Sequence, residues 1–222
     1  MKVDIDGVIQ MAKVPLSQFL RLALKDFTKI RKGRVAGVRL DPSMNKWIGF
    51  GSGESDCRVC LAGAAMHRTL GVRFENKEMD REMGLSLFGF GPSDLGALFH
   101  CHEVDLTGKT KDIQDRLPAA VAVVVARLQL LNNLRCDMDS AGRKLSQTLW
   151  LPGERSAKQV ALTQVEFIDT WMRRRPYPRQ EITGRDWVSP FDPDSTQEWN
   201  ELCDCMIANI RYLATMLKRA GF

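Results

Sequence analysis

The feature that most constrains how this chain can fold is the run AGAA, from Ala62 to Ala65, inside the glycine-bounded stretch GFGSGESDCRVCLAGAAMHRTLG of residues 49–71. Side chains this small let another helix or backbone approach closely, as it cannot against a leucine-rich surface. The sequence therefore predicts a central, buried helix over residues 54–70.

Both ends of this predicted helix are marked in the sequence. Ser52, Ser55 and Asp56 are all suited to cap its start, and Gly71 suits the position just after its last turn. The i, i+3 and i+4 spacing would also place four residues on one helical face: Cys57, Cys60, Ala64 and His67.

Amphipathic helical patterns account for most of the remaining chain. The clearest follows Pro15 and covers Leu16–Arg31, with an apolar stripe of Phe19, Leu20, Ala23, Phe27 and Ile30. Three more long helices are predicted, over Pro118–Arg135, Ser156–Arg173 and Ser195–Ala220, and we expect Pro118 to lie in the first turn of its helix.

Strand patterns are short and few. Val3–Gln10 alternates enough for a short strand, and Val35–Leu40 and Trp47–Phe50 flank the turn sequence DPSMN, which predicts a small hairpin. The expected fold is mainly α, a multi-helix globular bundle with at most a small β-hairpin near residues 35–50. Residues 1–150 would form the main domain around the 54–70 helix, with a C-terminal helical pair over 151–222 packed on it or merged into one single domain.

Composition favours a globular protein of the cytoplasm. Hydrophobic residues make up 44% and charged residues 27% of the chain, which argues against disorder. The longest apolar run, Leu117–Leu131, is interrupted by Arg127 and Gln129 and is too short to cross a bilayer, so we expect a core helix and no membrane contact. The acidic N-terminus lacks the pattern of a signal peptide, and six cysteines without other secretory features fit a reducing compartment.

One candidate site is a zinc centre. Cys57 and Cys60 supply a CxxC pair, and His100 and His102, or the nearer His67, would complete four tetrahedral ligands. The alternatives are thiol–disulfide exchange, which lacks its usual βαβ context here, and plain packing, because a free cysteine behaves as a small apolar residue. We favour packing, so no cofactor is expected, with zinc as the metal if one binds.

A second candidate site is the basic sequence RRRPYPR. Arginines beside an aromatic ring can follow a phosphate backbone, and arginine clusters also serve protein interfaces. The candidate binding residues are Arg173, Arg174, Arg175, Tyr177 and Arg179. Pro176 and Pro178 prevent helix continuation, so we expect an exposed connection.

A further basic group, KIRKGR, surrounds Gly33 at the end of the Leu16–Arg31 helix. Cations are favourable at the negative end of a helix dipole. We prefer this explanation, together with a solvated turn, to a contact with nucleic acid. A net charge of +5 permits such a contact but does not require it.

The sequence CRVCLAGAAM, residues 57–66, resembles the C-x-V-C-x-A-G-A helix of a family of small uncharacterised bacteriophage and prophage proteins. In that family a helix of the type ALxSLR follows after a loop, and Leu130–Arg135 would correspond to it. The resemblance covers at most residues 50–140 and carries over no catalytic residue. It implies a small accessory protein, a class that often binds a host macromolecule and includes inhibitors of host defence.

These observations support one leading functional hypothesis and two alternatives. The leading hypothesis is a phage-type accessory binding protein, more a binding protein than an enzyme, that inhibits or redirects a host protein or nucleoprotein complex, for example in host defence. The first alternative is a zinc-binding or thiol-dependent enzyme centred on the CxxC helix. The second is a nucleic-acid-binding protein that uses the RRRPYPR stretch.

Overall fold

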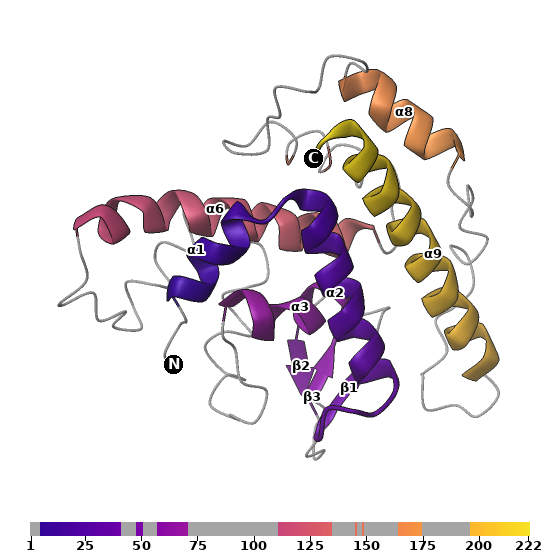
Figure 1. Ribbon diagram of the computed structural model, residues 1–222. Coiled ribbons are helices and arrows are strands. Elements are labelled where there is room, and N and C mark those ends of the chain that lie inside the picture. Colours follow the sequence, from indigo (N-terminus) through magenta and orange to yellow (C-terminus); the bar gives the residue numbers. More distant parts are fainter. Residues whose placement is uncertain are drawn as a thin grey trace.

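The computed structural model describes residues 5–40, 48–50, 57–70, 111–134, 145, 148, 164–174 and 196–222. Its elements in chain order are α1 (Ile5–Lys13), α2 (Leu16–Arg31), β1 (Val38–Leu40), β2 (Ile48–Phe50), β3 (Cys57–Val59), α3 (Leu61–Leu70), α6 (Lys111–Asn133), α8 (Gln164–Arg174) and α9 (Thr196–Ala220). Helices dominate and the sheet is small (Figure 1), so the prediction of a mainly α fold is confirmed.

Helix α2 has the bounds that its amphipathic pattern predicts, and all five residues of the predicted stripe are buried. Its end is a Schellman motif centred on Gly33, which has a φ of 64°. The Gly33 N–H donates to the Ile30 carbonyl at 2.8 Å, and the Arg34 N–H donates to the Lys29 carbonyl at 3.0 Å. The glycine therefore turns the chain sharply from α2 toward β1.

The predicted strand over Val3–Gln10 is wrong, because residues 5–13 form helix α1. Val8, Ile9 and Met11 are buried, so the apolar positions follow a helical face better than a period of two. Pro15 then separates α1 from α2 and adopts φ −53° and ψ 144°, which is outside the helical region.

Strands form at both predicted positions, but the predicted hairpin is wrong. The strand order is β1-β3-β2, so β3 lies between the two expected partners. It pairs in parallel with β1, Val38 opposite Cys57, and antiparallel with β2, Phe50 opposite Cys57. The local turn sequence predicted which segments are extended but not their pairing, which depends on a third strand.

The predicted 54–70 helix is in fact a strand followed by a shorter helix. Cys57 and Val59 are buried in β3, and α3 begins only at Leu61. The N-cap is Cys60: its carbonyl accepts from the Ala64 N–H at 2.9 Å and its Sγ from the Gly63 N–H at 3.5 Å. The three N-caps predicted upstream were therefore wrong.

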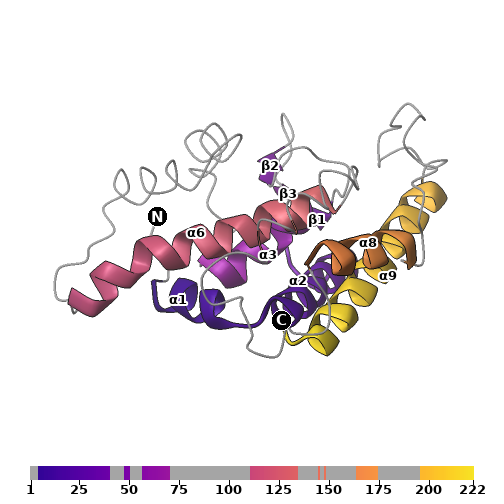
Figure 2. The same cartoon turned by 90° about the horizontal axis from the view of Figure 1, so that it is seen from above.

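The prediction that the small-residue helix is central and buried is confirmed. Ala62, Ala64 and Ala65 are at most 2% exposed. α3 packs against α1, α2 and α6 and lies between α2 and α6 (Figure 2). The small side chains allow this close approach of helices on both sides.

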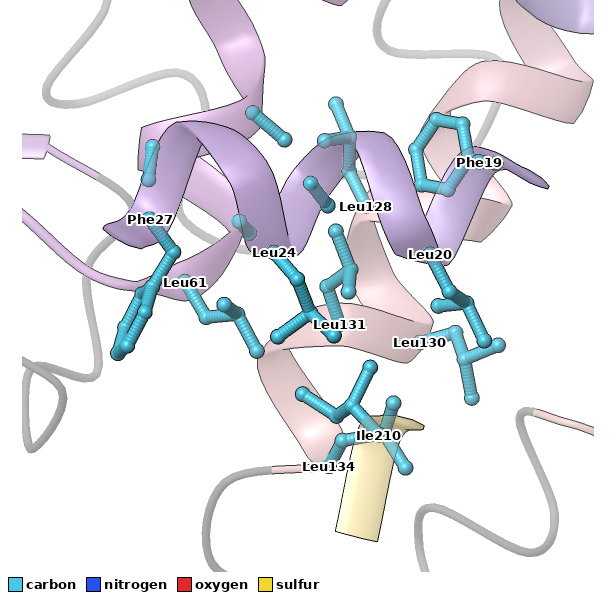
Figure 3. Packing of buried hydrophobic residues seen from close by; sticks show 14 of the residues in the cluster. Phe19, Leu20, Leu24, Phe27, Leu61, Leu128, Leu130, Leu131, Leu134 and Ile210 are labelled. Atoms are coloured by element: carbon cyan, nitrogen blue, oxygen red, sulfur yellow. The ribbon is translucent and has the colours of Figure 1, made fainter. Parts of the chain in front are cut away.

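Helix α6 begins at Lys111, so the prediction that Pro118 lies in its first turn is wrong. From Ala120 to Leu131 most of its residues are buried, as expected for a helix that is apolar on nearly all sides. Figure 3 shows Leu128, Leu130 and Leu131 of α6 gathered with side chains of α2, α3 and α9 in one core.

The C-terminal helices α8 and α9 complete this core. α9 runs alongside α2, and α8 lies beside the C-terminal half of α9 (Figure 1). A second Schellman motif at Gly221, with a φ of 87°, turns Phe222 back so that its N–H donates to the Leu217 carbonyl at 2.9 Å. The Phe222 ring then meets the Phe167 ring of α8, with 6.1 Å between centroids. Within the described part of the chain, no helix has the length and apolar character to cross a bilayer.

Candidate functional site

The first candidate site, the CxxC pair, is divided between two elements. Cys57 lies in β3 and Cys60 caps α3, and the side chains are 1% and 0% exposed respectively. Extended chain advances about 3.3 Å per residue, which puts the two Cα atoms roughly 10 Å apart, whereas a disulfide needs less than about 7 Å. The shared helical face that suggested a paired thiolate site is therefore absent.

Of the histidines predicted as ligands, His67 lies in α3, and His100 and His102 lie outside the described residues. Among the residues that are described, no group of three His, Cys, Asp or Glu side chains is placed to hold a metal ion. The zinc hypothesis stays a prediction. Elemental analysis of the purified protein tests it directly, with Cys57→Ser and Cys60→Ser as the variants that should lose the metal.

The second cysteine pair, Cys203 and Cys205, lies on α9. Cys203 is buried and Cys205 is half-buried. Burial, with help from the neighbouring Asp204 and Glu201, raises the pKa of the Cys205 thiol above its ordinary value. A thiol needs a lowered pKa to act as a nucleophile near neutral pH, so this environment does not favour thiol catalysis.

The basic candidate site begins on described structure. Arg173 and Arg174 form the last turn of α8 and both are exposed. Arg173 forms an ion pair with Asp169 one turn earlier, and its side chain is still 73% exposed. Arg175, Tyr177 and Arg179 lie outside the described residues. The helix ends at Arg174, as expected for a chain that reaches Pro176 two residues later.

Sequence reasoning missed the role of Arg127, a charged side chain in the centre of the core. It is 1% exposed, and its Nη1 donates to the carbonyl oxygen of Met11 at 2.6 Å. Its guanidinium carbon lies 5.3 Å from the centre of the Phe19 ring, a cation–π distance. Arg127 therefore links α6 to both α1 and α2.

Pro15 explains why an arginine is needed there. In a continuous helix the Met11 carbonyl would accept the N–H of residue 15, but proline has none. Arg127 supplies the missing donor. Met11 and Phe19, both of which it contacts, lie four residues before and four residues after the proline. The sequence signal for this pairing was a lone arginine in an apolar helix and a proline between two helical patterns.

Burial lowers the pKa of Arg127 to about 10, which still leaves the side chain charged at neutral pH. A buried charge is costly without a strong acceptor, and hydrogen bonds to charged groups are among the stronger ones. Because the guanidinium is enclosed by the core, it does not reach an external ligand. We assign it a role in positioning α1, α2 and α6.

A second arginine, Arg31, ties α2 to α9 near the surface. Its Nη1 lies 2.6 Å from Asp204 Oδ1, and its Nη2 donates to the Asn200 side-chain oxygen at 3.2 Å. The hydrogen bond from Arg31 holds the pKa of the Asp204 carboxyl below its usual value. Arg31 is therefore engaged within the fold and only 25% exposed, whereas the Arg173 side chain remains 73% exposed beside its own ion pair.

Comparison with known proteins gives no relative: no family model, curated protein or solved structure matches the chain.

Proposed function

We propose that this chain is an accessory binding protein of the phage type, which acts in the cytoplasm of a host cell by docking on a host protein or nucleoprotein complex. The main support for this proposal is the exposed cationic end of α8, formed by Arg173 and Arg174. It continues in sequence into Arg175 and Arg179. Arginine is enriched at protein interfaces and also contacts phosphate groups.

Two further observations support binding rather than catalysis. Cys57, Cys60 and Cys203 are buried, and the one charged side chain in the described core, Arg127, is used to join helices. The resemblance of residues 57–66 to a helix of small phage proteins supports the same class of function, by analogy.

The test is affinity capture from host lysate, followed by measurement of the Kd for the captured partner. Changing Arg173 and Arg174 to Ala should weaken that binding at least tenfold, because it removes two charges from the docking end. Lys218→Ala with Arg219→Ala is the matched control, since it also removes two exposed cations from the last turn of a helix. Equal affinity of the two variants, or no partner together with turnover of a metabolite library, would overturn the proposal.

A further inference from the structure

One face of α2 carries a row of exposed cations. Arg21, Lys25, Lys29 and Lys32 follow one another at spacings of four, four and three residues, and all four are exposed. Residues at these spacings share one side of a helix. We call these four residues the α2 stripe. At a rise of 1.5 Å per residue, the stripe extends about 17 Å along the helix axis.

The stripe is on the open side of α2. The apolar side of the helix packs on α3, and α9 packs beside α2, where Arg31 forms its ion pair with Asp204. Figure 2 shows α3 lying between α2 and α6. The exposure of all four stripe residues places them away from the sides of α2 that contact α3 and α9. None of the four side chains forms an ion pair with another described residue, whereas Arg31 on the same helix is paired with Asp204.

The helix dipole accounts for only part of the stripe. Its effect is confined to the last turn, which contains Lys29 and is followed by the cap residue Lys32. Arg21 and Lys25 lie further back, where the dipole gives them no advantage. Like charges four residues apart repel one another, so Arg21 with Lys25 and Lys25 with Lys29 weaken the isolated helix. The stripe is therefore not explained by the stability of α2.

We infer that the α2 stripe binds the phosphate backbone of a nucleic acid. Charge complementarity favours a polyanion, and the composition of the stripe favours phosphates over an acidic protein. Three of its four members are lysines, which are depleted at protein interfaces and frequent in contacts with phosphate. The stripe also lacks an aromatic residue, the usual anchor of a protein–protein contact. This surface is separate from the end of α8, so the inference goes beyond the proposed function.

The experiment measures binding of the full chain to a fluorescein-labelled 20-nucleotide single strand and to the corresponding duplex, between 50 and 200 mM salt. Each lost phosphate contact lowers the slope of log K against log salt by about 0.7 for single strands and 0.9 for duplex DNA. Changing all four stripe residues to Gln should therefore reduce the magnitude of the slope by about 2.8 for the single strand and about 3.6 for the duplex. Two probes of unrelated sequence should behave alike, because phosphate contacts carry no base information.

The matched control changes Lys13, Arg211, Lys218 and Arg219 to Gln, which removes the same four charges from exposed positions outside the stripe. This control should keep most of the wild-type slope, and the melting temperatures of the two variants should agree. Equal slopes for the two variants would overturn the inference, because net charge alone would then explain binding. So would absence of wild-type binding at 50 mM salt, or stripe-dependent binding to poly-glutamate but not to DNA.

The result of this salt-dependence experiment does not depend on the result of the partner-binding test at α8. A variant with Arg173 and Arg174 changed to Ala should keep the stripe-dependent part of the salt slope, and the stripe variant should keep the partner that depends on α8. Either proposal can therefore fail without the other.

Discussion

Helices α2 and α6 contribute to the same core but place their basic residues in opposite ways. α2 is amphipathic, and its arginines and lysines point to solvent or, as Arg31 does, to a surface partner. α6 is apolar on most sides and encloses Arg127, which bonds to the Met11 carbonyl. The difference teaches that the buried charge of α6 has a structural partner, the Met11 carbonyl, whose usual helical donor is missing because Pro15 has no N–H.

The largest effect should come from Arg127→Ala. The change removes a large buried side chain and leaves the Met11 carbonyl without its donor, while relief of the desolvated charge offsets part of the loss. We expect the free energy of unfolding to fall by about 2–4 kcal/mol. Arg21→Ala on α2 is the control, since an exposed arginine should change stability by less than about 0.5 kcal/mol. Urea denaturation measures both, and similar losses would contradict the contrast between the helices.

The link between Arg127 and Pro15 can be measured by a double-mutant cycle. Arg127→Met keeps much of the volume and should cost about 1–3 kcal/mol, mainly through the orphaned carbonyl. Pro15→Ala restores an N–H at position 15, so it should be more favourable in the Arg127→Met background than in the wild type. A coupling of about 1 kcal/mol is expected for groups that share a partner. Additive changes would show that the proline does not determine the role of the arginine.

A change in α3 probes the spacing between α2 and α6. Ala64 is 2% exposed in the small-residue run that lies between these helices. Ala64→Leu should destabilise the fold by about 1–3 kcal/mol, because extra methylene groups must displace packed neighbours. Ala119→Leu on the exposed side of α6 is the control and should stay within about 0.5 kcal/mol of the wild type. Equal tolerance of both changes, by thermal unfolding, would remove the case for close packing at α3.

The sequence predicted those parts of the fold that depend on local pattern. α2 and α9 were placed to within about a residue, because each has a long apolar stripe and clear ends. Apart from the start of α6, which lies seven residues before Pro118, the failures are short segments, where neighbours decide the structure. Val3–Gln10 was assigned to a strand on a brief alternation, and the 54–70 segment was assigned to one helix because CxxC fits i, i+3 spacing as well as a strand that leads into a cap.

For the candidate sites too, the predictions from local sequence succeeded where the feature is local and failed where it depends on distant residues. Arg173 and Arg174 are exposed as predicted, but they lie in the last turn of α8 and not on the connection that follows it. The grouping of Cys57 and Cys60 on one helical face was wrong, because Cys57 lies in β3. The contacts of Arg127 and the pairing of Arg31 with Asp204 join residues more than 100 positions apart, and no local pattern encodes them. The α2 stripe could be recognised only from the exposure and ion pairing of its side chains in the structure, because the spacing of charges alone does not show which side of a helix faces solvent.

A smaller effect is expected at the end of α2. Gly33 has a φ of 64°, and a Cβ added there would meet no atom within 4 Å, so strain of the backbone is the whole cost of a substitution. Gly33→Ala should lower the free energy of unfolding by about 1 kcal/mol. Gly33→Asn should lose less, because asparagine tolerates this conformation better. Equal losses for alanine and asparagine in chemical denaturation would indicate that something other than φ sets the cost.

The smallest effect concerns the ion pair between Arg31 and Asp204, whose side chains are 25% and 64% exposed. At pH 7 a double-mutant cycle with Arg31→Ala and Asp204→Asn should give a coupling below about 1 kcal/mol, as is usual for exposed pairs. Because the folded pKa of Asp204 lies below its ordinary 3.8, the folded state binds this proton less readily than the unfolded chain. The contribution is therefore complete above pH 4 to 5 and is lost as the pH falls through the folded pKa. If Arg31→Ala alone still lowers stability at pH 2 by as much as at pH 7, the Asn200 contacts of Arg31, which do not titrate, hold α2 and α9 together, and α2 would then resemble α6 in relying on neutral oxygen acceptors.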